Sequence, residues 1–267
     1  MTRYTQRLEQ LRHQGRSGLV TYLTAGDPQT GNTSEALLTL ARAGADLIEL
    51  GMPFSDPMAD GPTLQRAALR ALAAGETVQR TLASVQRFRE SDQDTPVVLM
   101  GYANPVWQYG VDAFCQAASK AGVDGLLLVD LPTDQGQPVR HACDANGLLW
   151  PRMVAPATDD QRLGFIAEQS TGFLYLVARN GVTGSGEVEQ VALEERLAMT
   201  RRLTGQPLAV GFGLRKPEHF RVLNGKADWI VIGSALHDTL ETAATPQEGL
   251  TALAAQVAEL RRALDVR

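Results

Sequence analysis

Residues 111–130 read VDAFCQAASKAGVDGLLLVD. The first part of this stretch, residues 111–121, has the apolar spacing of a helix, and Gly122 stands where helices commonly end in a left-handed residue. The next part, residues 125–130, is apolar on both faces, which is typical of a strand in a parallel sheet that is covered by helices. The stretch therefore predicts a helix that leads into a buried strand.

The same alternation of helical patterns and short apolar runs extends along the whole chain. Helical patterns lie at residues 34–43, 77–90, 111–121, 159–169 and 193–204, and an amphipathic opening helix is predicted near residues 4–14. The runs that predict strands are Leu19–Thr24, Asp46–Gly51, Pro96–Gly101, Gly125–Asp130, Leu148–Val154, Phe173–Ala178, Leu208–Phe212 and Trp229–Gly233.

This organisation predicts a closed barrel. Eight strand and helix pairs in 267 residues, with no Gly/Ser/Pro-rich linker and no shift in composition, match the size of a (β/α)₈ barrel. We therefore expect an α/β protein with a single TIM-barrel domain over residues 1–267 and an extra N-terminal helix. An open, doubly wound sheet is the alternative, but it needs a glycine fingerprint after the first strand, where residues 24–31 read TAGDPQTG.

Charge and hydropathy argue against nucleic acid and membranes as partners. The chain has Lys+Arg 25 and Asp+Glu 30, a formal net charge of −5, so it has no basic field to attract either one. Its apolar runs are far shorter than the roughly 20 residues that cross a bilayer. The opening residues 1–15 are polar and lack the apolar core of a signal peptide, so we expect a cytoplasmic protein. Cys115 and Cys143 are expected to be small core residues.

Glycines at the ends of the last strands predict a phosphate site. In barrels, the loops after strands seven and eight commonly bind phosphate through backbone N–H groups, which a Cβ atom would block. Here those strands end in Gly211–Gly213 and in Gly233 followed by Ser234. Residues 179–186, RNGVTGSG, form a further glycine-rich loop that could act as a lid. The alternative interpretation is that these glycines only permit tight turns.

Two carboxylates are the candidate catalytic groups. Glu49 lies inside the apolar run LIEL and should either point into the barrel mouth or pair with a buried cation. Burial would raise its pKa toward neutrality, as a general acid or base requires. Asp60 follows on the adjoining loop and could reach the same cavity, whereas Asp56, Asp130 and Asp134 are expected to be caps, turn formers or surface contacts.

The positions of lysine and histidine narrow the chemistry further. No lysine lies at a predicted strand end, which disfavours a Schiff-base aldolase. The four histidines fall in helical or surface stretches without the spacing of metal ligands, so we expect no catalytic metal. Carboxylate acid/base chemistry on a phosphorylated substrate remains.

Several stretches resemble the α subunit of tryptophan synthase, and they are spread over essentially the whole chain. The longest and most specific is IELGMPFSDPMADGPT at 48–63. The others are LTAGDP at 23–28, MGYANP at 100–105, AGVDGLLLVDLP at 121–132, GVTG at 181–184, VGFG at 210–213 and IGSA at 232–235. The resemblance implies a (β/α)₈ lyase that cleaves indole-3-glycerol phosphate to indole and glyceraldehyde 3-phosphate, without a cofactor in this chain.

The resemblance also implies roles for single residues. Glu49 would protonate indole C3 and handle the hydroxyl proton, Asp60 would accept from the indole nitrogen, and Tyr175 would lie beside Glu49 and help to position the substrate. The phosphate would be held by backbone at Gly184, Gly213 and Gly233 and by the Ser234 hydroxyl, and Thr183 and Arg179 would belong to the lid. The indole slot would be lined by strand-end residues that could equally be ordinary barrel filling, namely Tyr22, Met100, Leu127, Val129, Phe212 and Ile232.

A partner follows from the same resemblance. Members of the family associate with a β subunit that carries pyridoxal phosphate, and an α2β2 heterotetramer is expected. Pro53, Asp56, Asn104 and Pro132 would face that subunit, although the prolines could instead serve only to stiffen their loops.

The chain departs from the family at Tyr22, where Phe is usual, and at Asn180 and Trp229, where small residues are usual. A non-catalytic α-type partner, a stand-alone lyase and another phosphosugar barrel isomerase or epimerase are the alternative functions.

Overall fold

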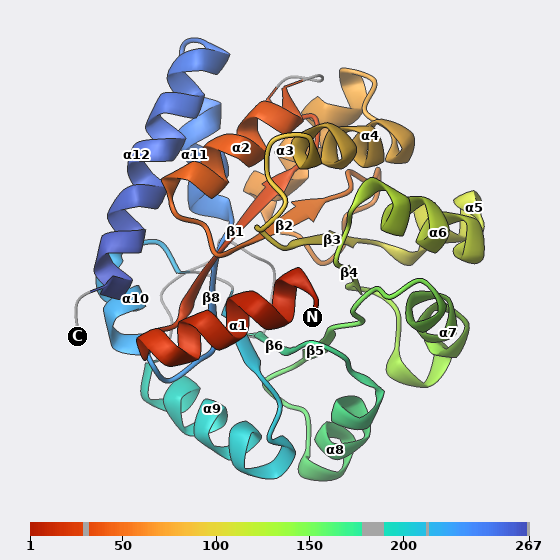
Figure 1. Cartoon of the computed structure of the whole chain (residues 1–267), viewed down its shortest axis with the longest axis vertical. Coiled ribbons are helices and arrows are strands. Elements are labelled where there is room, and N and C mark those ends of the chain that lie inside the picture. The colour runs from red at the N-terminus through yellow and green to blue at the C-terminus, as the bar shows by residue number, and fades with distance from the viewer. Residues whose placement is uncertain (29–31, 178–189, 212–213, 266–267) are drawn as a thin grey trace.

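The computed structural model describes residues 1–28, 32–177, 190–211 and 214–265, and its eight parallel strands form a barrel wall with helices around it (Figure 1). The strands are β1 (Gly18–Thr24), β2 (Leu47–Gly51), β3 (Val97–Gly101), β4 (Gly125–Leu128), β5 (Arg152–Val154), β6 (Leu174–Val177), β7 (Leu208–Gly211) and β8 (Trp229–Ile232). Each predicted run overlaps one of these strands, so the expected order of elements is confirmed.

The strands pair in the order β4-β3-β2-β1-β8-β7-β6-β5, and all the ladders are parallel. The barrel closes between β4 and β5 through a single bridge from Gly125 to Leu149, where the N–H of Leu126 donates to the carbonyl of Leu149 at 2.9 Å. The predicted TIM barrel is therefore confirmed.

Two predicted strands are shorter than expected by at least two described residues. The run Leu148–Val154 forms a strand only over Arg152–Val154, because Pro151 lacks an N–H group and interrupts the ladder after Leu149. The fourth strand ends at Leu128, and beyond it the carboxylate of Asp130 accepts a hydrogen bond from the N–H of Ala103 at 2.8 Å.

Helices surround the barrel, and those predicted are present within one to three residues of their expected ends. These are α1 (Arg3–Gln14), α2 (Thr33–Ala43), α4 (Val78–Arg89), α6 (Val111–Ala121), α8 (Asp160–Gln169) and α9 (Gln190–Thr204). The remaining helical elements are α3 (Pro62–Ala73), α5 (Ala103–Tyr109), η1 (Thr133–Gln135), α7 (Gln137–Ala145), α10 (Pro217–Leu223), α11 (Ser234–Thr242) and α12 (Pro246–Asp265). Gly44 and Gly122 end their helices with φ of 108° and 88°, as predicted.

Alternate residues of each strand pack on opposite sides of the wall. The outer set packs against the helices and includes Leu23, Leu50 and Ile232. The inner set fills the barrel and includes Tyr22, Met100, Leu127, Tyr175 and Val231. Ile232 therefore faces the helices, and its predicted place in the indole slot is wrong.

Helix α1 covers the amino end of the barrel. Its Tyr4, Leu8 and Leu11 join the inner cluster, and the Trp229 indole donates to the Tyr4 hydroxyl at 3.2 Å. The large side chain of Trp229 thus packs against the Tyr4 ring in a tilted arrangement, with ring centroids 5.5 Å apart.

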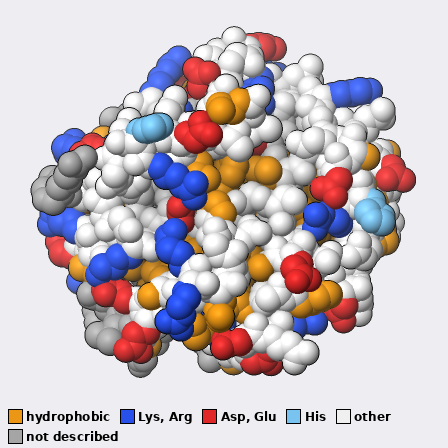
Figure 2. Space-filling model, turned by 60° about the horizontal axis from the view of Figure 1, so that its bottom comes forward, with side chains coloured by type: hydrophobic (Ala, Val, Ile, Leu, Met, Phe, Trp, Pro, Cys, Tyr) orange, Lys and Arg blue, Asp and Glu red, His pale blue; other side chains and the backbone are white. Residues whose placement is uncertain are grey.

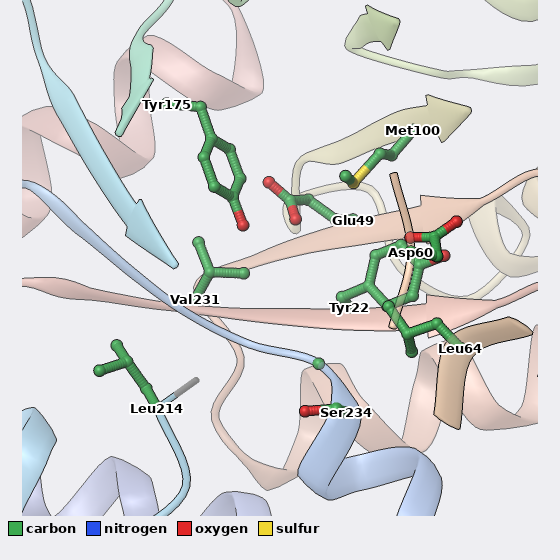
Figure 3. Close-up of a pocket in the computed structure, with 10 residues that line it drawn as sticks. Tyr22, Glu49, Asp60, Leu64, Met100, Tyr175, Leu214, Val231 and Ser234 are labelled. Atoms are coloured by element: carbon green, nitrogen blue, oxygen red, sulfur yellow. The ribbon is translucent and has the colours of Figure 1, made fainter. Parts of the chain in front are cut away.

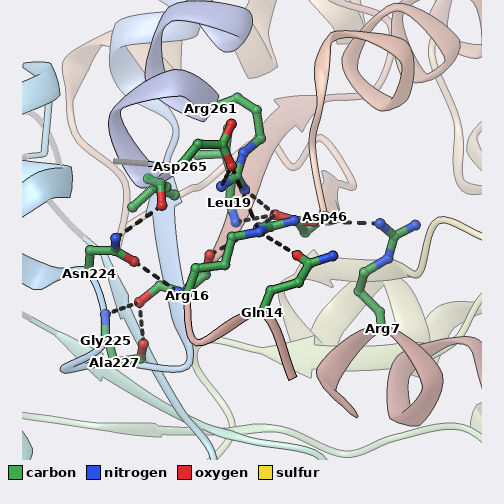
Figure 4. A network of polar contacts seen from close by, with 12 residues as sticks. Arg7, Gln14, Arg16, Leu19, Asp46, Asn224, Gly225, Ala227, Arg261 and Asp265 are labelled. Carbon is green, nitrogen blue, oxygen red and sulfur yellow. Dashed lines mark hydrogen bonds and ion pairs between the residues drawn. The ribbon is translucent and has the colours of Figure 1, made fainter. Parts of the chain in front are cut away.

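Three aspartates at this amino end each stand directly before a strand and accept a backbone N–H of the neighbouring strand. Asp46 accepts from Leu19 at 2.9 Å, Asp124 from Val97 at 2.8 Å and Asp228 from Leu208 at 3.0 Å. Arginines surround each carboxylate, and Figure 4 shows Arg7, Arg16 and Arg261 converging on Asp46. We call Asp46, Asp124 and Asp228 the lower carboxylates.

The surface carries both signs of charge. Figure 2 shows acidic and basic side chains interspersed on one face, around hydrophobic side chains near its middle. Among the described residues, no helix is long and apolar enough to cross a membrane, and no group of three or more acidic, histidine or cysteine side chains could hold a metal ion. Cys115 and Cys143 are buried and free, as expected for core residues, with their sulfur atoms 3.9 Å apart.

Candidate active site

A cavity of about 430 Å³, open to solvent on one side, lies at the carboxyl end of the barrel (Figure 3). It is lined by Tyr22, Glu49, Asp60, Leu64, Met100, Tyr175, Leu214, Val231, Gly233 and Ser234. A second cavity of about 330 Å³ shares Tyr22, Asp60, Leu64 and Met100 with the first and extends along the loop after β2. Both predicted carboxylates therefore reach one cavity.

Glu49 points into the barrel from the middle of β2. Its side chain is 1% exposed, and neither carboxyl oxygen has a hydrogen-bond partner among the described residues. Burial raises the pKa of Glu49 to about 8, because the charged form loses its hydration without a compensating cation. Of the two orientations that the sequence left open, the one toward the barrel mouth is therefore observed. At neutral pH this group holds a proton that it can donate.

Tyr175 projects from β6 toward the same point. Figure 3 shows the Glu49 carboxyl group between Tyr175 and Met100. A Cβ atom on Gly211 would collide with the Tyr175 hydroxyl, so this glycine provides the space that the ring needs. Burial, and next the charge that Glu49 would carry, raises the pKa of Tyr175 well above its ordinary value. Tyr175 is therefore a neutral hydroxyl that faces the Glu49 side of the cavity.

Asp60 enters the cavity from the loop before α3. The Tyr102 hydroxyl donates to Asp60 Oδ2 at 2.9 Å and accepts from the N–H of Ala59 at 3.0 Å, so one tyrosine holds both the carboxylate and the backbone of the preceding residue. Burial raises the pKa of Asp60, and the bond from Tyr102 offsets only part of this rise. The two carboxylates thus differ, because Asp60 has a hydrogen-bond donor and Glu49 has none among the described residues.

The start of α11 offers backbone donors on the other side of the cavity. The first intrahelical bonds run from the N–H of Leu236 and His237 to the carbonyl of Gly233, so the preceding N–H groups of Ser234 and Ala235 have no intrahelical acceptor. A Cβ atom on Gly233 would lie 3.3 Å from that of Tyr22, and glycine therefore lets the helix start approach β1 closely. A helix N-terminus with free N–H groups and a serine hydroxyl suits a phosphate.

The apolar wall follows the prediction in part. Tyr22 and Met100 line both cavities, and Val129 lines the second. The added hydroxyl of Tyr22 accepts from Thr24 Oγ1 at 3.4 Å. Leu127 is buried inside the barrel and lines neither cavity. The remaining site residues and the lid lie outside the described residues, namely Arg179, Asn180, Thr183, Gly184, Phe212 and Gly213.

The residues expected to face a partner lie on loops at the same end of the barrel. Asp56, Asn104 and Pro132 are exposed, and Pro53 is half-buried where the loop lines the second cavity. Met58, on that loop, is 72% exposed, and Trp107 of α5 is 47% exposed. Both side chains add apolar surface to loops at this end of the barrel.

Comparison with known proteins identifies the family. Residues 8–265 match the model of the family described as tryptophan synthase alpha chain. The chain belongs to the tryptophan synthase alpha chain family. Tryptophan synthase alpha chains of Caulobacter sp. (strain K31) and Caulobacter vibrioides are each 47% identical to it over 249 residues, 93% of this chain and 90% of theirs.

Solved structures agree with this membership. The tryptophan synthase alpha subunit of Legionella pneumophila has a TM-score of 0.92 and 38% identity, over 99% of each chain. A chain of Mycobacterium tuberculosis tryptophan synthase has a TM-score of 0.91 and 34% identity, over 100% of this chain and 99% of that chain. Cleavage of indole-3-glycerol phosphate is the known function of the tryptophan synthase alpha family, and membership implies a β-subunit partner.

The sequence interpretation missed Tyr102, although it quoted the motif that contains it. The position directly after a strand end, in MGYANP, was the available signal. It also missed Leu64, Leu214 and Val231 as lining residues. Side chains of this type are so common in barrel walls that the sequence alone does not single them out.

Proposed function

We propose that this chain cleaves indole-3-glycerol phosphate to indole and glyceraldehyde 3-phosphate with Glu49 and Asp60 as its acid and base groups. The observation that carries the proposal is the Glu49 carboxyl group, buried in the cavity without a hydrogen-bond partner in the described part of the chain and with a pKa of about 8. A group that is protonated at neutral pH and can ionise during turnover is what the reaction requires.

In the first step, protonated Glu49 donates its proton to C3 of the indole ring. The ring becomes an indoleninium ion with its positive charge at the nitrogen, and Glu49 becomes a carboxylate. Asp60, held by Tyr102 at 2.9 Å, accepts the N–H of the ring and stabilises this charge. Two carboxylates in different surroundings thus serve two different atoms.

In the second step, the Glu49 carboxylate removes the proton of the glycerol hydroxyl next to the ring. The hydroxyl carbon becomes the aldehyde, the bond to C3 breaks, and its electron pair restores the aromatic indole. Glu49 ends the cycle protonated, so no net proton is consumed. The high pKa of Glu49 keeps the carboxyl group protonated at neutral pH before the first transfer, and it makes the carboxylate a stronger base in the second transfer.

The substrate is held at both ends. Phosphate would bind at the start of α11, on Gly233 and Ser234, with Gly184 and Gly213 as further backbone donors. The indole ring would lie against Tyr22 and Met100, and the Tyr175 hydroxyl would orient the glycerol chain. Fixing both ends brings the cleaved bond to Glu49 and lowers the entropic cost of reaching the transition state.

The partner would be a β subunit that binds pyridoxal phosphate, and the assembly would be an α2β2 heterotetramer. Exposed Met58 and Trp107, together with Asp56, Asn104 and Pro132, support a contact at this end of the barrel. This chain would use no cofactor of its own. Its cytoplasmic location stays a prediction from the polar opening segment.

The test is to incubate the purified chain with indole-3-glycerol phosphate, alone and with a β subunit, and to measure indole. We expect slow indole release by the chain alone, faster turnover with the β subunit, and co-elution of the two chains. Ligand binding that activates the β subunit without any indole release would support the non-catalytic alternative. Turnover that the β subunit does not change would favour the stand-alone lyase.

A further inference from the structure

A polar bridge beside the cavity, buried at two of its three residues, joins three parts of the barrel that each carry a site residue. At its centre is Asp27, whose side chain is fully buried in the loop after β1. Arg70 of α3 donates to both oxygens of Asp27, at 2.8 and 3.1 Å, and His237 Nδ1 lies 2.9 Å from Oδ2. We call these three residues the Arg70–Asp27–His237 bridge.

The hydrogen bonds of His237 indicate which tautomer its ring adopts. The N–H of Thr24 donates to His237 Nε2 at 3.2 Å, so Nε2 carries no proton, and the neutral ring must carry its proton on Nδ1. Nδ1 therefore donates to Asp27. Burial raises the pKa of Asp27, but the bonds from His237 and Arg70 outweigh that effect and hold it below its ordinary value. Both ring nitrogens are used, and His237 cannot turn without losing a buried hydrogen bond.

Each end of the bridge reaches a different part of the site. His237 lies in the first turn of α11, three residues after Ser234. Thr24 ends β1 and donates to the Tyr22 hydroxyl at 3.4 Å. Arg70 belongs to α3, which begins at Pro62, two residues after Asp60. The phosphate end and the indole end of the cavity are therefore connected through the fully buried Asp27 and His237 and the partly exposed Arg70.

A second contact between the same helices provides a comparison. Arg66 and Arg70 both pair with Glu241 of α11, Arg66 at 2.8 Å and Arg70 at 2.9 Å. Only Arg70 also holds Asp27. A substitution of Arg66 thus loses a pairing of α3 with α11 and leaves the Arg70–Asp27–His237 bridge intact.

We propose that the Arg70–Asp27–His237 bridge is a positioning element of the lyase reaction, which fixes Asp60 and Tyr22 relative to the first turn of α11. The inference rests on the proposed function, because it concerns the spacing of the groups that hold the two ends of the substrate. The cleaved bond lies between those ends. An error in their spacing misaligns the reacting atoms while leaving each end able to bind, so it affects the transition state more than substrate binding.

The experiment compares Arg70→Met with the matched control Arg66→Met in steady-state cleavage of indole-3-glycerol phosphate. For Arg70→Met we expect kcat to fall about tenfold, with KM changed less than about twofold, because a misplacement below 1 Å already has effects of this size. Arg66→Met should retain kcat and KM. Arg70→Lys keeps one charged donor to Asp27 and should recover most of kcat.

Two further measurements separate positioning from simple loss of structure. Thermal melting monitored by circular dichroism gives the folded fraction at the assay temperature, and kcat is expressed per folded molecule. Inhibition by glycerol 3-phosphate should be the same in Arg70→Met as in the unmodified chain, because its phosphate site is intact. Asp27→Asn, which weakens both pairings of the bridge, should reproduce the fall in kcat.

The proposal is overturned if Arg70→Met and Arg66→Met have the same kcat per folded molecule, or if Arg70→Met raises KM and leaves kcat unchanged. If the unmodified chain cleaves the substrate and Arg70→Met cleaves it equally well, only the bridge proposal fails. If the unmodified chain releases no indole with or without a β subunit, the proposed function fails, and the bridge proposal fails with it.

Discussion

Asp46, directly before β2, and Glu49, in the middle of β2, lie three residues apart, and their surroundings are opposite. Asp46, at the amino end, accepts from the N–H of Leu19 and pairs with Arg7, Arg16 and Arg261. Glu49, toward the carboxyl end, has neither a donor nor a cation among the described residues. Both side chains are at least 97% buried.

The difference separates two uses of a buried carboxylate. At the amino end, the lower carboxylates neutralise arginines and satisfy strand N–H groups, so their charge supports the fold. At the carboxyl end, Glu49 is left without such partners and its affinity for a proton rises. The contrast therefore lies in the partners of each carboxylate, because Asp46 is paired with arginines and Glu49 has no cation beside it among the described residues.

The largest effect that would sharpen this contrast is expected from Glu49→Gln. The amide has nearly the same shape but cannot donate or accept the reacting proton, so indole formation should fall about 10³-fold or more. The far-ultraviolet circular dichroism spectrum should be unchanged. Substantial turnover by this variant would remove Glu49 from the mechanism and break the comparison.

The next largest effect is expected from Asp60→Asn. The substitution removes the negative charge that faces the indole nitrogen, and kcat should fall about 10²-fold, with a smaller change in KM. Asp144→Asn, which alters an exposed pair with Arg140, is the control and should retain kcat. If kcat falls less than a few-fold in Asp60→Asn, Asp60 does not act on the indole nitrogen in the reaction.

Asp46→Asn tests the other end of the barrel. It leaves three arginines facing a neutral amide, and the free energy of unfolding should fall by about 3 kcal/mol. Urea unfolding measures this change. As a control, Asp134→Asn, which alters an exposed pair with Arg162, should lower the free energy of unfolding by less than about 1 kcal/mol. The activity per folded molecule should remain that of the unmodified chain, and a selective loss of kcat would contradict the division between the two ends.

The smallest effect concerns pH. The pKa of Glu49 is raised to about 8 in the folded chain from an ordinary value of 4.5, so the folded state holds this proton more tightly than the unfolded one. The corresponding contribution to stability is complete below about pH 4.5 and is lost as the pH rises through about 8. Glu49→Gln should therefore melt several degrees higher than the unmodified chain at pH 9, and at the same temperature at pH 4.

The pH dependence of activity should report the same titration of Glu49. Because Glu49 must be protonated to begin the reaction, kcat/KM should decline as the pH rises through about 8. The acid limb should follow Asp60, which must be ionised and whose pKa is raised above its ordinary value by burial. A profile that is flat from pH 7 to pH 10 would contradict this assignment of Glu49.

Much of this arrangement follows from local sequence. Strands that are apolar on both faces predict a helix-covered barrel, and an acid inside such a run, as in LIEL, has only the interior or a buried cation to face. The glycines at the strand ends and the loop 52–63 also indicated that the cavity lies at the carboxyl end of the barrel. These inferences need only neighbouring residues.

The contacts that complete the site join residues far apart in the chain. Tyr102 holds Asp60 across 42 positions, and His237 holds Asp27 across 210. The sequence placed the histidines in helical or surface stretches, and His237 is indeed helical, yet it is fully buried. No local pattern reports such pairs, because they depend on which loops the closed barrel brings together. The expected site residues in 178–189 and 212–213 stay predictions.

The wall of the barrel is weakest between β4 and β5, which are joined by the single bridge from Gly125 to Leu149. We call this place the seam. Every other pair of neighbouring strands is joined by a ladder, whereas β4 and β5 meet through the short run before Pro151. Local opening of this bridge would convert the closed barrel into an open curved sheet and would leave all seven ladders intact. The amides of Leu126 and Leu149 would then exchange with deuterium ahead of those in β1, and the seam lies diametrically across from the β1–β8 junction that carries Tyr22 and the phosphate end.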